Sequence, residues 1–138
     1  MSTPTRAETQ ISIALESIQG KRRIERVMEA ANALLDRYAT KFDPEERLTL
    51  GYELIRRNFT GEISIVYGDL ALGTDADHQG ETTFHCELLG PEGRTGTLTA
   101  HYTEPGSLGL TSSEWLAAMR LLAGISGLGI GGHAVCPA

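Results

Sequence analysis

The chain changes character near Gly61, and this change restricts its fold more than any short motif does. Residues 1–60 carry ten of the twelve Lys and Arg residues and nine of the eighteen Asp and Glu residues, a net charge of +1. Residues 61–138 carry two basic and nine acidic residues, a net charge of −7. The first part has the apolar spacing of helices, whereas the second is rich in Gly and Thr and alternates like strands. We therefore expect a helical half, 1–60, and an acidic, β-rich half, 61–138.

Length and composition indicate one globular domain spanning 1–138. A chain of 138 residues builds a single core, and 41% hydrophobic residues is an ordinary globular content. No run of 18 apolar residues and no secretory signal is visible, and only two cysteines, Cys86 and Cys136, are present. We expect a cytoplasmic protein with both thiols free. The net charge of −6 argues against nucleic-acid binding.

Two apolar stripes follow one another in the first 40 residues. The first is Ile11, Leu15 and Ile18, and the second runs from Ile24 to Tyr38. At about 100° per residue the two stripes would lie on opposite sides of one straight helix. Either the chain turns at Gly20, or one stripe faces a different partner, and we favour the turn.

The segment Asp43-Pro44-Glu45-Glu46 predicts the start of a further helix. Asp43 suits the N-cap, Pro44 suits the first helical position, and the acidic residues favour the positive end of the helix dipole. The helix should reach about Asn58. Because Leu50 and Leu54 lie opposite its main apolar face, we expect this helix to be sandwiched, inside the fold or between subunits.

The β-rich half predicts a strand over 62–67, with an extension to 72 left open, and then a hairpin. Strands 82–89 and 94–103 flank a loop in which Pro91 and Glu92 fit a type I turn and Gly93 fits a left-handed position. Paired residue numbers should then sum to 184, which places Cys86 on an apolar face and His85 on a polar one. A capping box at 111–114 predicts a last helix to about residue 123.

These elements predict an α+β fold. Two or three N-terminal helices should pack on an antiparallel β-meander of three or more strands, with the C-terminal helix closing the core.

Candidate catalytic residues follow from the hairpin register. His85 and His101 should lie diagonally on one face, with Glu87 in reach, a set that suits acid–base chemistry. Tyr67, Tyr102 and Trp115 are the candidate lining of a pocket between helices and sheet. We predict no metal and no cofactor, since two histidines without a third ligand do not make a metal site.

Three other patterns are weaker indications of a functional site. The loop from Asp75 to Gly80 has alternating oxygen donors, but its twelfth position is Cys86 rather than Glu, which argues against calcium. The glycines of 127–132 match a dinucleotide fingerprint, but they follow a helix instead of a strand. The thiols are expected to be inert, because Cys86 should be buried and Cys136 is close to the end of the sequence.

The remaining features favour a binding role. Asp75, Asp77 and Glu81 would attract a basic protein partner, and Leu50 and Leu54 would serve a partner helix or a second copy. Our first hypothesis is thus a non-catalytic interaction or regulatory domain that self-associates. The alternative is a small-molecule-binding protein or enzyme that uses His85, His101 and Glu87.

Overall fold

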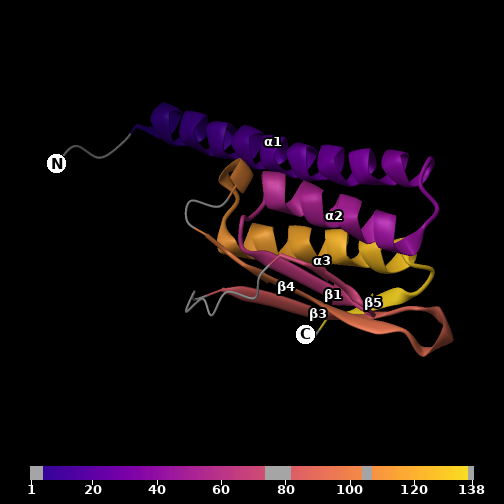
Figure 1. Cartoon of the computed structure of the whole chain (residues 1–138). Coiled ribbons are helices and arrows are strands. Elements are labelled where there is room, and N and C mark those ends of the chain that lie inside the picture. Colours follow the sequence, from indigo (N-terminus) through magenta and orange to yellow (C-terminus); the bar gives the residue numbers. More distant parts are fainter. Residues whose placement is uncertain (1–4, 74–81, 104–106, 137–138) are drawn as a thin grey trace.

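The computed structural model describes residues 5–73, 82–103 and 107–136, and it stacks them in three layers (Figure 1). A five-stranded antiparallel sheet forms one outer layer, α2 (Pro44–Asn58) and α3 (Ser112–Gly129) cover one of its faces, and α1 (Arg6–Tyr38) lies on these two helices. The predicted α+β class and the packing of helices on an antiparallel sheet are confirmed. The first helix, however, makes its main contacts with α2 and α3 instead of the sheet.

The predicted turn at Gly20 is wrong, because α1 is one continuous helix of 33 residues. The buried residues of α1 that the structure describes lie in its C-terminal half: Ala31, Leu34 and Tyr38 pack against the other helices. The first stripe is exposed, so the other alternative, that one stripe faces a different partner, stays a prediction. A single Gly inside a helix costs about 1 kcal/mol of stability relative to Ala. This cost is too small to break a helix that continues on both sides of Gly20.

The second helix begins and ends as predicted. The Asp43 carboxylate accepts a hydrogen bond from the Glu46 amide at 3.1 Å, and the helix ends at Asn58. Leu48 and Ile55 are fully buried, whereas Leu50 and Leu54 are partly buried on the other side. The expected sandwich is real and lies inside the fold, with α2 between α1 and strand β1 (Ile63–Tyr67).

The sheet has the strand order β2-β1-β4-β3-β5, so it is not the simple meander that we predicted. The chain reverses at Gly68 and Asp69, and β2 (Leu70–Leu72) pairs back onto β1 instead of extending it. β1 and β4 (Thr95–His101) pair with each other in the interior of the sheet. Their inward side chains, Ile63, Ile65, Leu98 and Ala100, are buried, and this explains why the two strands are central.

The hairpin of β3 (Thr83–Leu89) and β4 has the predicted register. Cys86 pairs with Leu98 on the buried face and His85 pairs with Thr99 on the open face. Gly93 has the expected positive φ, +76°, but Glu92 also has a positive φ, +61°. The expected type I turn is therefore wrong, since its third residue requires a negative φ.

The C-terminal segment departs most from expectation. α3 continues to Gly129 and is followed by a short strand, β5 (His133–Val135), which pairs with β3. The glycines serve close packing here. A Cβ on Gly127 would lie 2.5 Å from the Ala134 nitrogen, and one on Gly129 would lie 2.7 Å from the Tyr38 ring. Helix propensity is overridden by the approach of β5 and α1.

Candidate interaction surface on the first helix

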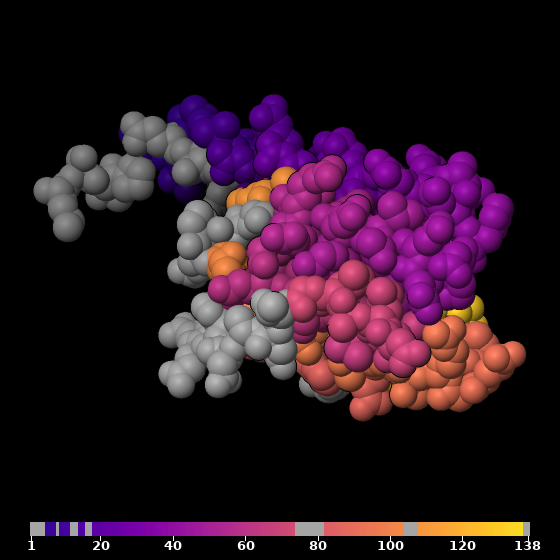
Figure 2. All heavy atoms as spheres, in the orientation of Figure 1, coloured from indigo at the N-terminus to yellow at the C-terminus, as the bar shows by residue number. Residues whose placement is uncertain are grey.

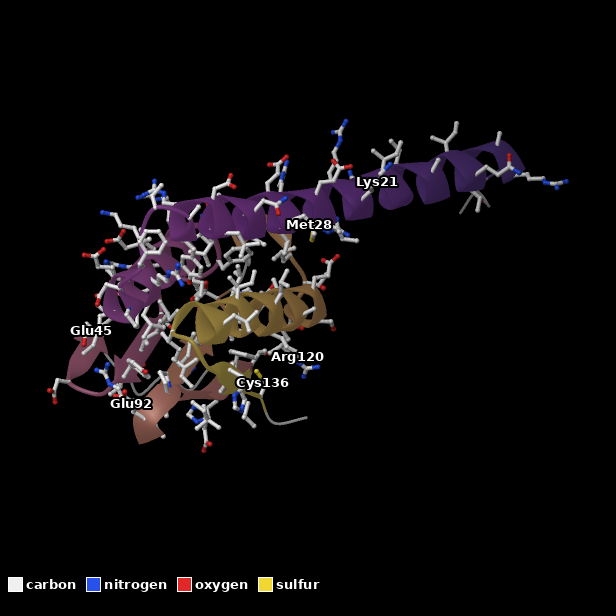
Figure 3. The ribbon with its side chains drawn as sticks, turned by 90° about the vertical axis from the view of Figure 1, so that its right-hand side faces the viewer. Lys21, Met28, Glu45, Glu92, Arg120 and Cys136 are labelled. Atoms are coloured by element: carbon white, nitrogen blue, oxygen red, sulfur yellow. The ribbon has the colours of Figure 1, made fainter. Side chains whose placement is uncertain are left out.

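The N-terminal half of α1 extends past the ends of α2 and α3 (Figures 1 and 3). We call residues 6–20 the overhang. Three of its apolar residues face solvent, with exposed fractions of 60% for Ile11, 54% for Leu15 and 49% for Ile18. Three large apolar side chains that are about half exposed on one face of a helix favour an interaction site.

Arg23 marks the place where α1 leaves the body of the protein. Its Nε donates to both carboxylate oxygens of Glu114, at 3.1 and 3.2 Å, across the gap to the start of α3. The pKa of Glu114 is lowered, first by its hydrogen bond from the Thr111 amide and also by Arg23. The carboxylate is therefore retained to lower pH than usual, and the tie between α1 and α3 weakens only as the pH falls through this lowered pKa.

A groove of about 410 Å³ lies between α1 and α2. Figure 2 shows this side of the molecule, with α1 in indigo and purple above α2 in magenta. The apolar lining includes Leu50 and Leu54, two of the residues predicted to bind a partner, and they lie together as expected. The remaining apolar lining comes from α1 and from the turn before α3: Ala30, Ala33, Leu34 and Leu108.

Charged side chains of both signs border the groove. Arg26, Arg37 and Arg57 contribute three positive charges, and Glu29 and Glu53 contribute two negative charges. A mixed rim around an apolar floor suits a helix with a similarly mixed flank. None of these five charged residues was predicted as part of a site; their spacing along the two helices was the available signal.

A second apolar strip lies on the α3 side of α1. Ile24, Met28 and Leu35 of α1 are exposed there, and Leu121 and Leu128 of α3 are exposed on the neighbouring helix. Figure 3 looks onto this side and shows Met28 below α1, toward α3. This strip lies on a different face of α1 from the overhang stripe, so it provides a built-in comparison for any test of the overhang.

The two predicted histidines lie on the same face of the sheet, where His85 is exposed and His101 is buried, and each has a threonine partner on the adjacent strand. His85 Nδ1 lies 2.9 Å from Thr99 Oγ1, and His101 Nδ1 lies 3.0 Å from Thr83 Oγ1. Glu87 is exposed on the same strand as His85. No group of three or more His, Cys, Asp or Glu among the described residues is placed to hold a metal. A catalytic role for this set stays a hypothesis.

Of the three aromatic residues proposed to line a pocket, Trp115 and Tyr67 belong to the core and Tyr102 is partly buried against it. Trp115 is fully buried, and its Nε1 donates to the Phe59 carbonyl oxygen at 3.2 Å. Tyr102 packs edge-on against Trp115 and donates to the Leu110 carbonyl oxygen at 2.7 Å. Tyr67 is fully buried, with Arg94 4.9 Å from its ring centre. They hold the helices on the sheet and do not line the groove.

The Tyr67 hydroxyl yields a stability prediction. It is buried without a hydrogen-bond partner among the described residues and lies against Gly90. We expect Tyr67→Phe to raise the free energy of unfolding by about 1 kcal/mol, because the change removes an unsatisfied polar group. Tyr102→Phe is the matched control. It should lower the free energy of unfolding by about 1 kcal/mol, because the Tyr102 hydroxyl that it removes donates a hydrogen bond. Urea unfolding measures both, and a loss for Tyr67→Phe would contradict the argument.

The predicted acidic binding residues Asp75, Asp77 and Glu81 lie outside the described residues, so their role stays a prediction. Within the described part of the β-rich half, Asp69, Glu87 and Glu92 are exposed. These three come from different strands or turns and do not form a binding site by themselves.

Comparisons with known proteins add no family. No protein-family model matches the sequence, and neither the curated proteins nor the solved structures contain a match. In the part of the chain that the structure describes, none of the helices is long and apolar enough to cross a membrane. Function is therefore inferred from the molecule's own surfaces.

Proposed function

We propose that this protein is a non-catalytic interaction domain that works as a homodimer, with the overhang of each copy seated in the α1–α2 groove of the other. The main observation in support is the exposed stripe of Ile11, Leu15 and Ile18 on a helix that extends beyond the core of the protein. In this arrangement the apolar side chains that a single copy leaves in water become buried.

Helix geometry selects the α1–α2 groove over the α1–α3 strip. At about 100° per residue, the overhang stripe points in roughly the same direction as Glu29 and Ala33, which border the groove. Met28 and the rest of the α1–α3 strip point to another side. A two-fold axis brings the same face of α1 together in both copies. An antiparallel pair of α1 helices that places Leu15 over Ala33 of the second copy therefore seats both overhangs at once.

Charges near the centre of this pair are of both signs. With Leu15 opposite Ala33, the pair is centred at residue 24, so Arg22 of one copy lies opposite Arg26 of the other, with Glu25 and Glu29 nearby on the same helices. All four side chains are exposed in the single copy. Like charges that face each other weaken such a pair, so the apolar contacts of the stripe must supply its stability.

The available area suits a stable dimer only if the exchange is reciprocal. A 15-residue helix is about 22 Å long, and with its side chains half buried it covers about 400 Å². One overhang in one groove would fall short of the roughly 800 Å² per partner that stable interfaces bury. Two symmetric contacts reach this value, because each copy supplies a helix and a groove.

The test is the oligomeric state of the whole chain by sedimentation velocity, from about 1 to 200 µM. We expect a dimer that Leu15→Glu weakens at least a hundredfold, because each dimer then loses two buried leucines and gains two desolvated carboxylates. Ala33→Arg, on the groove side, should have the same effect by filling the seat of Leu15. Circular dichroism of each variant confirms that the fold is retained.

Met28→Glu is the matched control, since Met28 is a similarly exposed apolar residue, 50% exposed, on the other face of the same helix. We expect it to leave the dimer intact. A monomer at all concentrations, or a dimer that dissociates with Met28→Glu but not with Leu15→Glu, would overturn the proposed arrangement.

A further inference from the structure

The two cysteines are direct neighbours across the β3–β5 ladder. Glu87 pairs with Val135 and Leu88 pairs with Ala134, so the next position in this antiparallel register sets Cys86 opposite Cys136. Directly opposed residues on antiparallel strands have Cα atoms about 4.5 to 5.5 Å apart. This separation lies within the range of about 4.4 to 6.8 Å that a disulfide spans. The sequence alone could not show this, because the residues are far apart in the chain and β5 was not predicted.

The two side chains also lie on the same side of the sheet. Cys86 is fully buried, and Cys136 is partly buried and packs against the same core. The neighbouring Cys136 is near enough to contribute to the raised pKa of Cys86. Both thiols are free, so the structure presents a reduced pair. The register and the packing of both side chains against one core lead to the same pairing.

We propose that Cys86 and Cys136 form a reversible disulfide that ties β5, and with it the C-terminal segment, to β3. The proposal is independent of dimerisation. A low-molecular-weight disulfide, such as oxidised glutathione, supplies the oxidant. The Cys136 thiolate attacks one of its sulfurs and expels a glutathione thiolate, which forms a mixed disulfide. The Cys86 sulfur then attacks the Cys136 sulfur and expels the second glutathione thiolate. Two protein thiols are oxidised, one glutathione disulfide is reduced to two thiols, and the two protein protons go to these products.

The structure assigns the order of the two attacks. Cys136 is the more accessible thiol, whereas Cys86 is shielded below the sheet. Burial, and after it the neighbouring Cys136, raises the pKa of Cys86 to about 12, so Cys86 stays protonated and unreactive while Cys136 is a free thiol. Conversion of Cys136 to a mixed disulfide places a sulfur electrophile beside Cys86. Cys136 is thus the attacking thiol and Cys86 the resolving one.

The bond would strengthen the weakest edge of the sheet. β5 has only three residues, and β3 and α3 are its principal contacts. The disulfide would close a loop of about 50 residues, which raises the melting temperature by roughly 10 °C in a chain of this size. Oxidation would hold the short strand in place, and reduction would return it to its non-covalent contacts alone.

Oxidised glutathione added to the purified, reduced full-length chain tests this, with mass spectrometry of the intact protein. We expect the wild type to lose two hydrogens and to accumulate little glutathione adduct, because Cys86 resolves the mixed disulfide. In Cys86→Ala the adduct on Cys136 should persist, and Cys136→Ser should remain unmodified. Melting of the oxidised and reduced wild type should differ by roughly 10 °C.

The outcome that overturns the proposal is equally direct. If the wild type retains the glutathione adduct as Cys86→Ala does, the two sulfurs do not meet in solution. A bond formed between copies instead of within one would appear as a covalent dimer on a non-reducing gel, and it would also overturn the pairing. The chain has two cysteines, so a monomeric disulfide has no other assignment.

Discussion

Trp115→Ala should lower the free energy of unfolding by about 4 kcal/mol, one of the largest losses expected from a single substitution in this chain. The indole is fully buried, and its Nε1 donates to the Phe59 carbonyl oxygen at the end of α2. Tyr102 packs against it with ring centres 5.6 Å apart. The substitution therefore removes apolar burial, opens a cavity and leaves the Phe59 carbonyl without its donor. Because a domain is stable by only about 5 to 15 kcal/mol, this loss would bring the protein near its limit.

Chemical denaturation followed by circular dichroism measures the effect, since the substitution removes the only tryptophan as a fluorescence probe. Leu128→Ala is the matched control, because Leu128 lies in the same helix but is 70% exposed. Its loss should stay within about 0.5 kcal/mol. Equal losses for the two variants would contradict the burial that the structure assigns to Trp115.

Gly96→Ala should destabilise the protein by at least about 3 kcal/mol, although it adds only one methyl group. Gly96 lies on β4 between Tyr67 of β1 and Leu88 of β3. A Cβ at this position would lie 2.1 Å from the Val66 carbonyl oxygen and 2.8 Å from the Tyr67 Cα. Since both neighbouring atoms belong to the backbone, the two central strands would have to separate.

Gly124→Ala supplies the opposite expectation in the same background. Gly124 lies inside α3, and a Cβ there meets nothing within 4 Å. Alanine should stabilise the protein by about 0.5 to 1 kcal/mol through helix propensity. Thermal melts of the two variants should shift in opposite directions, and a Gly96→Ala protein as stable as wild type would show that β1 and β4 are not packed as described.

Local chemistry explains what the sequence could predict. The cap at Asp43 and the hairpin around Gly93 depend on residues close together in the chain. Both the helix start and the predicted register of the hairpin, in which paired residue numbers sum to 184, are confirmed. The inner position of Cys86 followed from that register. Such features need no knowledge of distant contacts, so they are accessible to a reading of one sequence.

Most features that the sequence did not predict depend on contacts between residues far apart in the chain. Gly127 and Gly129 of α3 are poor helix residues, and only the approach of Ala134 and Tyr38 makes them suitable there. β5 exists because it pairs with β3, some 50 residues earlier. Gly20 was expected to break α1 because both stripes were assumed to need one core. The groove was also not predicted, because its two walls come from different helices whose contact cannot be seen in the sequence. Only Leu50 and Leu54 of its lining were predicted to bind a partner.

The overhang has a consequence for the thermodynamics of assembly. A helix of about 15 residues without tertiary contacts is marginal in water. In an isolated copy the amide protons of this segment should therefore exchange with solvent far faster than those after Arg23. Any partner that captures the segment must offset the entropy lost when it becomes fixed, so the affinity would be sensitive to substitutions that change helix propensity alone, even at positions that touch nothing.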